Sequence, residues 1–145
     1  MSIVALHTDL PISAQHAAAL ARKPALMQYV LAPLVTLPRL TAPEHLDVGT
    51  RLSARLWWFG VIPAWTHHLE IRQLDELTIY TNERSGPVRT WNHRLTFTPL
   101  DEQRCRYTDE IETDDGIIGA LTRMFIRLLF THRHRRWRTL AAIVA

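Results

Sequence analysis

The sequence contains a single cysteine, Cys105, among its 145 residues. One thiol cannot form a disulfide within the chain, and the eight histidines do not follow the paired spacing of a metal site. No run of about 18 uncharged apolar residues occurs, and the N-terminus lacks a basic segment followed by a long apolar one. These absences exclude a disulfide scaffold and a membrane-spanning helix. They predict a soluble cytoplasmic protein with no metal and no other cofactor.

The sequence also lacks internal repeats, low-complexity tracts and linkers rich in Gly and Ser. Its length and its 47% content of hydrophobic residues are sufficient for one buried core. We therefore expect one domain spanning residues 1–145.

The net charge is only +3, but the basic residues are unevenly distributed. They crowd the C-terminal segment, as Arg123, Arg127, His132, Arg133, His134, Arg135, Arg136 and Arg138. Cations near the C-terminus of a helix oppose its macrodipole, and a run of charge is commonly a solvated helix end. Such a tract can also contact phosphates or an anionic membrane surface. No second basic element accompanies it, so we do not expect nucleic acid as a partner.

Period-two alternation of apolar and polar residues predicts strands in several segments. These are Ser2 to Thr8, Thr50 to Phe59, Trp65 to Gln73, Leu77 to Glu83, Val88 to Thr98 and Arg104 to Thr113. Short turns between the last of them favour an antiparallel meander. Ser13 can cap a helix reaching Arg22, and Pro24 begins a second short helix towards Leu31. The prolines at 33, 38 and 43 indicate a loop.

The alternation from Val88 assigns Trp91, His93, Leu95 and Phe97 to one inward face of the sheet. A turn at 101–103 fixes the pairing with the next strand. Phe97 then faces Tyr107, Leu95 faces Asp109 and His93 faces Ile111. Asp109 is therefore predicted diagonally beside His93, within reach of its side chain.

A long helix is predicted from Ile117 almost to the C-terminus, after Asp114-Asp115-Gly116. At about 100° per residue, two apolar stripes appear on it. The first comprises Ile117, Leu121, Met124, Phe125, Leu128 and His132; the second comprises Ile126, Phe130, Trp137, Leu140 and Val144; Arg123, Arg127, His134 and Arg138 share a polar face. A helix this broadly apolar must be covered on more than its sheet side. Loops, a ligand or a partner subunit can provide the cover, which includes a homodimer formed through this helix.

His93 and Asp109 are the candidate catalytic residues. A His beside an Asp can act as a general acid and base, with the Asp holding one imidazole nitrogen. The same residues can instead form a buried polar pair that fixes the sheet and anchors a ligand. No nucleophile accompanies them, and the sequence leaves both interpretations open.

Other residues whose side chains can bind a ligand or a metal, or act as a nucleophile, are interpreted as structural. Trp57, Trp58, Phe59 and Trp65 can line a pocket, although aromatic residues more often pack in cores. Adjacent histidines on a strand point to opposite faces, which argues against a metal site at His67 and His68. Cys105 has no histidine partner in the sequence pattern and is expected to be inert.

The order of strand, two short helices, antiparallel meander and long C-terminal helix resembles the helix-grip fold of the START-like, Bet v 1-like superfamily. The resemblance is greatest to bacterial members of the polyketide cyclase or SRPBCC type. Trp91-Asn92-His93-Arg94-Leu95-Thr96-Phe97 resembles a W-x-H-x-h-x-F strand of that family, where h is apolar. Tyr107 to Glu112, followed by Gly116, resembles its segment before the final helix. Asp114-Asp115 stands where these relatives frequently have a Pro-Gly turn.

The resemblance implies an α+β fold, in which a curved antiparallel sheet of about six strands wraps around the C-terminal helix. It also implies a cavity between sheet and helix for a hydrophobic small molecule such as a lipid, polyketide or aromatic compound. The residues expected around that ligand are Trp91, His93, Leu95, Phe97, Tyr107, Asp109, Ile111, Leu121, Met124, Phe125 and Leu128. Binding without catalysis is our first interpretation. The alternatives are a cyclase or dehydratase that uses His93 and Asp109, and a module that binds protein or RNA through the basic helix.

Overall fold

A computed structural model describes residues 1–43 and 45–145. Within these residues the chain forms three helices and one antiparallel sheet of seven strands. The strands are β1 (Ser2–Leu10), β2 (Val35–Thr36), β3 (Arg51–Trp58), β4 (Ile62–Leu74), β5 (Thr78–Ser85), β6 (Val88–Asp101) and β7 (Arg104–Thr113). The helices are α1 (Ala14–Ala21), α2 (Pro24–Leu31) and α3 (Gly116–Val144).

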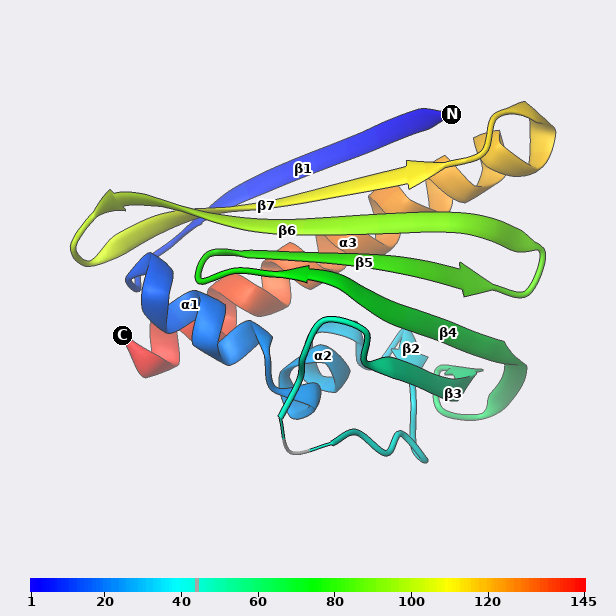
Figure 1. Cartoon of the computed structure of the whole chain (residues 1–145), viewed down its shortest axis with the longest axis horizontal. Coiled ribbons are helices and arrows are strands. Elements are labelled where there is room, and N and C mark those ends of the chain that lie inside the picture. The colour runs from blue at the N-terminus through cyan, green and yellow to red at the C-terminus, as the bar shows by residue number, and fades with distance from the viewer. Residues whose placement is uncertain (44) are drawn as a thin grey trace.

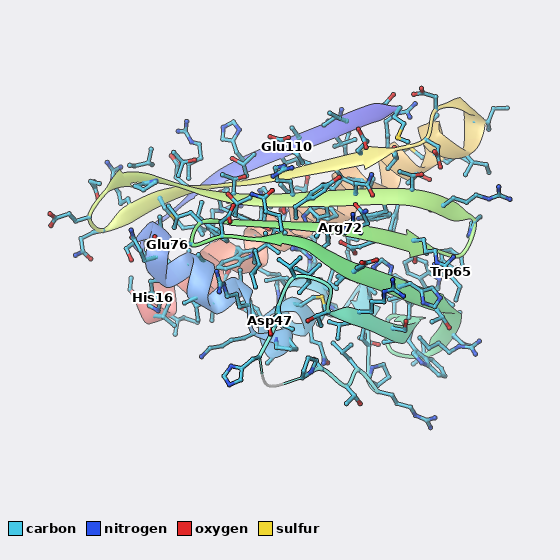
Figure 2. The ribbon with its side chains drawn as sticks, in the orientation of Figure 1. His16, Asp47, Trp65, Arg72, Glu76 and Glu110 are labelled. Atoms are coloured by element: carbon cyan, nitrogen blue, oxygen red, sulfur yellow. The ribbon has the colours of Figure 1, made fainter. Side chains whose placement is uncertain are left out.

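The strands lie in the order β1-β7-β6-β5-β4-β3-β2. Strands β3 to β7 form the predicted meander, and β1 pairs with β7 at one edge of the sheet. Helix α3 runs along one face of the sheet, while α1 and α2 lie beside the C-terminal half of α3 (Figure 1). Exposed charged residues such as Arg72 and Glu110 are on the opposite face (Figure 2). This is the helix-grip arrangement expected from the sequence.

The sheet has one strand more than the six predicted from the sequence, because β2 lies in a segment whose prolines predict a loop. Val35 pairs with Trp58, and Thr36 pairs with Trp57. A strand of two residues is too short to show a period of two, so alternation cannot reveal it. The short helices match the prediction closely: the hydroxyl of Ser13 accepts a hydrogen bond from the His16 amide, and α2 begins at Pro24.

The predicted register of β6 and β7 is confirmed. Phe97 pairs with Tyr107, Leu95 with Asp109 and His93 with Ile111. The inward face of β6 is also as predicted, because Trp91, His93, Leu95 and Phe97 are all buried. A period of two and a short turn together determine which side chains meet across the pair.

Helix α3 faces the sheet with the second of its apolar stripes, whereas the helix residues predicted to face the cavity belong to the first. Ile126, Phe130 and Trp137 of the second stripe are buried. Met124 and Leu128 of the first are 59% and 67% exposed, so the assignment of these two residues to the cavity is wrong. His134, assigned to the polar face, is also buried. With apolar residues on both sides of the helix, periodicity alone does not identify the side that meets the sheet.

The core consists of two buried clusters along α3. One joins α1 and the C-terminal end of α3 to β6 and β7, and includes Phe97, Tyr107 and Trp137. The other surrounds Ile126 and Phe130 nearer the middle of α3. No helix in the described part of the chain has the length and apolar composition needed to cross a membrane.

Candidate functional site

A cavity of about 450 Å³ lies between the sheet and helices α2 and α3. Its wall is largely apolar and includes Met27, Val30, Leu31, Leu52, Leu56, Trp58, Trp65, Leu69, Ile71, Ile79, Trp91, Leu95, Leu121, Phe125 and Leu129. The ring of Trp58 packs edge-on against Trp65, with centroids 5.9 Å apart, and against Phe125 at 5.4 Å. Cavities of this size and composition accommodate small apolar molecules.

The cavity lies on one side of α3 because the helix packs unevenly on the sheet. Its main sheet contacts are with β1, β7 and β6. Strands β3, β4 and β5, together with Trp91, His93 and Leu95 of β6, contribute side chains to the cavity wall, and α2 covers part of the remaining opening. The helix therefore closes one half of the curved sheet and leaves space over the other.

One polar cluster in this wall is centred on Glu83 of β5. Its carboxylate accepts hydrogen bonds from His67 Nε2 at 2.6 Å and from the Thr81 hydroxyl at 2.5 Å. Burial alone would raise the pKa of Glu83, but the hydrogen bonds and attraction from His67 and His93 lower it far below its usual range. Glu83 is therefore a buried carboxylate that stays ionised.

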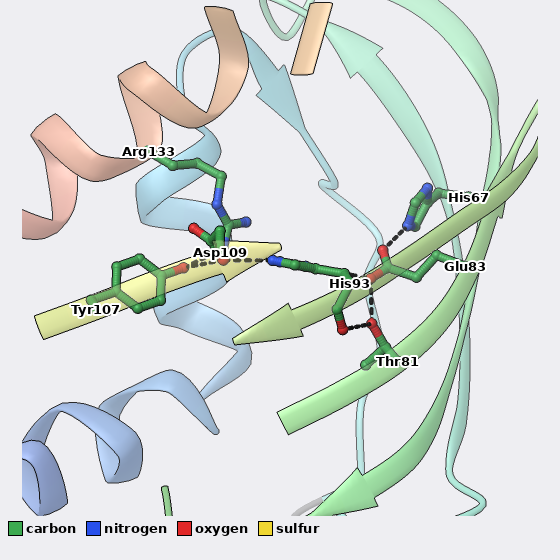
Figure 3. Close-up of polar contacts among 7 residues, drawn as sticks. All are labelled: His67, Thr81, Glu83, His93, Tyr107, Asp109 and Arg133. Atoms are coloured by element: carbon green, nitrogen blue, oxygen red, sulfur yellow. Dashed lines mark hydrogen bonds and ion pairs between the residues drawn. The ribbon is translucent and has the colours of Figure 1, made fainter. Parts of the chain in front are cut away.

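A second buried carboxylate, Asp109 of β7, accepts hydrogen bonds from three side chains (Figure 3 draws two of them). His93 Nε2 and the Tyr107 hydroxyl bind its Oδ1 at 2.5 and 2.7 Å, and His134 Nε2 binds its Oδ2 at 2.7 Å. Burial opposes ionisation, but attraction to His93 and these bonds keep the pKa of Asp109 well below its usual range. Burial and the nearby Asp109 raise the pKa of Tyr107 far above its usual value, so its hydroxyl remains a donor.

His93 lies between the two carboxylates. Its Nε2 binds Asp109, and its Nδ1 is 3.6 Å from Glu83 Oε2. Burial by itself lowers the pKa of His93, but attraction and hydrogen bonding to Asp109 and Glu83 outweigh it and raise the pKa. Only the imidazolium form presents N–H groups to both carboxylates. His93 is thus held as a cation whose two nitrogens face protein groups.

Arg133 of α3 brings a second buried cation to the cavity wall (Figure 3). Its Nη2 donates a 3.3 Å hydrogen bond to the Tyr107 hydroxyl, and its guanidinium carbon lies 4.7 Å from the centre of the Phe130 ring. Its Nε has no hydrogen-bond partner among the described residues. Arg133 therefore keeps unused donor capacity at the boundary between the polar cluster and the apolar cavity.

The residues predicted to surround a ligand divide into three groups. Trp91, His93, Leu95, Leu121 and Phe125 line the cavity. Phe97, Tyr107, Asp109 and Ile111 are buried outside its wall, where Asp109 and Tyr107 support His93 and Arg133. Met124 and Leu128 are on the exposed side of α3.

Several polar residues of the site are not predicted from the sequence to point inward as a group. These are His67, Thr81, Glu83, Arg133 and His134. Two signals were available. Glu83 shares the face of the inward Ile79 and Thr81 at a period of two. Arg133 falls between Phe130 and Trp137 on the stripe that is buried. In a sequence pattern, a charged residue at an apolar position indicates the end of the apolar stripe. Only a known partner for the charge would indicate that the residue is buried.

The basic C-terminal tract is also used differently from the prediction of a solvated helix end. Arg133 and His134 point inward. His132 Nε2 bonds to the Ala32 carbonyl, and Arg136 lies over the ring of Tyr29 while its Nε donates to the Tyr29 carbonyl. His132 and Arg136 therefore connect α3 to α2 and its C-terminal end.

Chemically, the arrangement can hold an apolar molecule and present hydrogen-bond donors to one end of it. Acid and base catalysis by His93 would require a ring nitrogen directed at a substrate. Its two nitrogens instead face Asp109 and Glu83. The geometry therefore favours binding over proton transfer in the resting arrangement.

A family model described as a domain of unknown function, DUF8410, matches residues 9–140. No curated protein matches the sequence.

Solved structures of low sequence identity share the fold over nearly the whole chain. A protein from Chromobacterium violaceum has a TM-score of 0.80 and 13% identity, covering 97% of this chain and 98% of its own. A START superfamily protein from Mycobacterium smegmatis has a TM-score of 0.76 and 11% identity, covering 99% of both chains. The Zhui aromatase/cyclase from Streptomyces sp. R1128 has a TM-score of 0.69 and 11% identity, covering 97% of this chain and 93% of its own. The fold is therefore that of the START-like helix-grip proteins.

Proposed function

The chain belongs to the DUF8410 family, and we propose that it binds an apolar small molecule in the cavity between its sheet and α3. The observation that carries this proposal is the cavity of about 450 Å³ with its largely apolar wall. Burial of an apolar surface contributes about 25 cal/mol per Å², so a molecule that fills this space gains most of its affinity from the wall.

Native mass spectrometry of the purified protein tests the proposal directly. A bound molecule of one dominant mass is expected, and extraction after denaturation then identifies it as an apolar compound. A protein that retains nothing is next titrated with N-phenyl-1-naphthylamine, an uncharged dye whose fluorescence increases in apolar surroundings. A protein that retains no molecule and also does not bind the dye would contradict the proposal.

Two neighbouring leucines of α3 provide a matched pair of variants. Leu129 is buried and lines the cavity, whereas Leu128 is 67% exposed. Leu129→Trp is expected to fill part of the cavity and weaken dye binding by about tenfold, equivalent to about 1.4 kcal/mol. Leu128→Trp adds the same ring outside the cavity and should leave the affinity unchanged. Equal behaviour of the two variants would place the binding site elsewhere.

A cyclase or dehydratase is the second candidate, supported by the His93 and Asp109 pair and by the fold shared with an aromatase/cyclase. The engagement of His93 with both carboxylates makes it the weaker candidate. Incubation with a poly-β-ketone thioester and analysis of the products tests it. Turnover that disappears in a folded His93→Gln variant, while dye binding persists, would establish catalysis.

A further inference from the structure

Arg133 combines burial, charge and a shortage of partners in a way that the apolar wall does not explain. Its side chain is only 7% exposed, and it forms no ion pair with any described residue. A guanidinium carries five N–H donors. Its only hydrogen bond to another described residue is the 3.3 Å contact from Nη2 to the Tyr107 hydroxyl. Removing a charged donor from water without partners is costly.

The neighbouring carboxylates are already occupied by other donors. Asp109 accepts from His93, Tyr107 and His134, and Glu83 accepts from His67 and Thr81. The hydroxyl of Tyr107, which Arg133 contacts, donates onward to Asp109. The polar cluster therefore holds Arg133 in place without using most of its donors.

Because Arg133 lines the cavity, its N–H donors that have no partner are available to a ligand there. Arg133 lies in the cavity wall between Phe130 and Trp137, which also line the cavity. We infer that Arg133 binds a hydrogen-bond-accepting oxygen at one end of an otherwise apolar ligand. This inference rests on the proposed function, because it assigns the polar end of a molecule held in the same cavity.

The charges around Arg133 constrain the chemistry of that oxygen. Glu83 and Asp109 are balanced by Arg133 and the imidazolium of His93. A neutral carbonyl oxygen preserves this balance, while a carboxylate adds a negative charge that Arg133 directly opposes. A cationic end would meet no unoccupied carboxylate among the described residues of the cavity wall, and the guanidinium would repel it. Ketones and carboxylates are therefore expected to bind, and amines to be rejected.

Competition by ligands with one chain length and different ends tests the inference. N-phenyl-1-naphthylamine bound to the protein is displaced with 2-decanone, decanoate, decylamine or decane. The ketone or the carboxylate should compete at least about tenfold better than the amine and better than decane, a factor equivalent to about 1.4 kcal/mol. Their relative strength shows whether the preferred oxygen is neutral or charged.

Variants of two arginines on α3 assign the preference to one side chain. Arg133→Met should abolish the advantage of the oxygen-bearing ligands while decane still competes. Arg127 is exposed on the same helix, so Arg127→Met serves as the matched control and should retain the advantage. Arg133→Lys keeps the charge but loses the planar fork of donors, and is expected to restore the advantage only in part. Circular dichroism establishes that each variant is folded.

The outcomes separate this inference from the proposed function. Equal competition by all four ligands in the wild-type protein would overturn the role of Arg133 and leave apolar binding intact. A preference that survives Arg133→Met would overturn it as well. Absence of dye binding and of any retained ligand would contradict the proposed function itself. The wild-type comparison needs no variant, so it can still overturn the inference if Arg133→Met does not fold, and Arg133→Lys then tests the assignment to this side chain.

Discussion

Two halves of the same sheet meet α3 differently. Strands β1 and β7 pack against the helix, whereas β3, β4 and β5 face the cavity; β6 lies between them and contributes to both. In the packed half, the rings of Phe97 and Tyr107 stack with centroids 5.1 Å apart, and Trp137 of α3 lies 5.1 Å from Tyr107. In the open half, side chains that are equally apolar line the cavity instead of packing against α3. Inward orientation alone therefore does not distinguish a core residue from a residue that lines the cavity.

The polar network lies along the boundary between these halves. Asp109 is on β7, His93 on β6 and Glu83 on β5, so the row runs from the packed side to the cavity wall. Each carboxylate is surrounded by donors, and His93 connects them. The network stabilises the boundary only while its charges remain matched.

The largest expected effect comes from removing the charge of Asp109. Asp109→Asn leaves His93 and Arg133 buried without their balancing carboxylate, and should lower the free energy of unfolding by about 3–5 kcal/mol. Urea denaturation measures the change. Asp9→Asn removes an exposed partner of Arg106 and serves as the control, with only a minor effect expected. Similar losses in both variants would contradict a special role for the buried network.

A smaller effect, a difference of about 1–3 kcal/mol between two leucine variants, distinguishes the packed and open halves. Leu10 is buried in the packed cluster, and Leu56 lines the cavity. Leu10→Ala should cost about 3–5 kcal/mol, because it creates a new void among close neighbours. Leu56→Ala enlarges existing space and should cost about 2 kcal/mol, the lower end of such substitutions. Equal costs would indicate that the open half is packed as tightly as the other.

The smallest expected effect is the dependence of stability on pH, which arises from the polar network at the boundary. The pKa of His93 is raised on folding, so its stabilising contribution is fully present below the unfolded value of about 6.5. This contribution should be lost as the pH rises through the pKa of His93 in the folded protein. Wild-type stability in urea is therefore expected to fall from pH 6 towards alkaline pH. His93→Gln, which cannot titrate, should lack this contribution; an identical slope in both proteins would assign the loss to other groups.

Acidic conditions should affect the network through the opposite linkage. The pKa values of Glu83 and Asp109 are lowered on folding, so their contribution is present above the unfolded values of about 4. It is expected to be lost as the pH falls below that range. Glu83→Gln should reduce the acid sensitivity measured by urea denaturation at pH 5 and pH 3. An unchanged sensitivity would argue against ionised Glu83 in the folded protein.

The fold was largely predictable because its signals are local. Period-two alternation and a short turn specified the pairing of β6 with β7, and Ser13 and Pro24 indicated the starts of α1 and α2. Strand β2 was missed because two residues cannot show a period. The contact between His93 and Asp109 was predictable for the same reason as the register, since it joins neighbouring strands.

The remainder of the candidate site depended on contacts between distant segments. Glu83 belongs to the network because β5 lies beside β6 and because His67 of β4 reaches it. Arg133 and His134 belong to it because one particular face of α3 was selected for burial. Met124 and Leu128, equally apolar in sequence, were left on the other face.

Backbone geometry imposes a fixed period on each element, so the sequence specified most of the helices and strands, the register of β6 with β7 and the inward face of β6. The side of α3 that meets the sheet, and the half of the sheet that remains open, depend on contacts between distant segments. The tertiary structure also decided that a basic residue within an apolar stripe, Arg133, lies at the cavity wall. The physical reason is that burial depends on the whole surface an element meets. That surface is assembled from segments far apart in the chain.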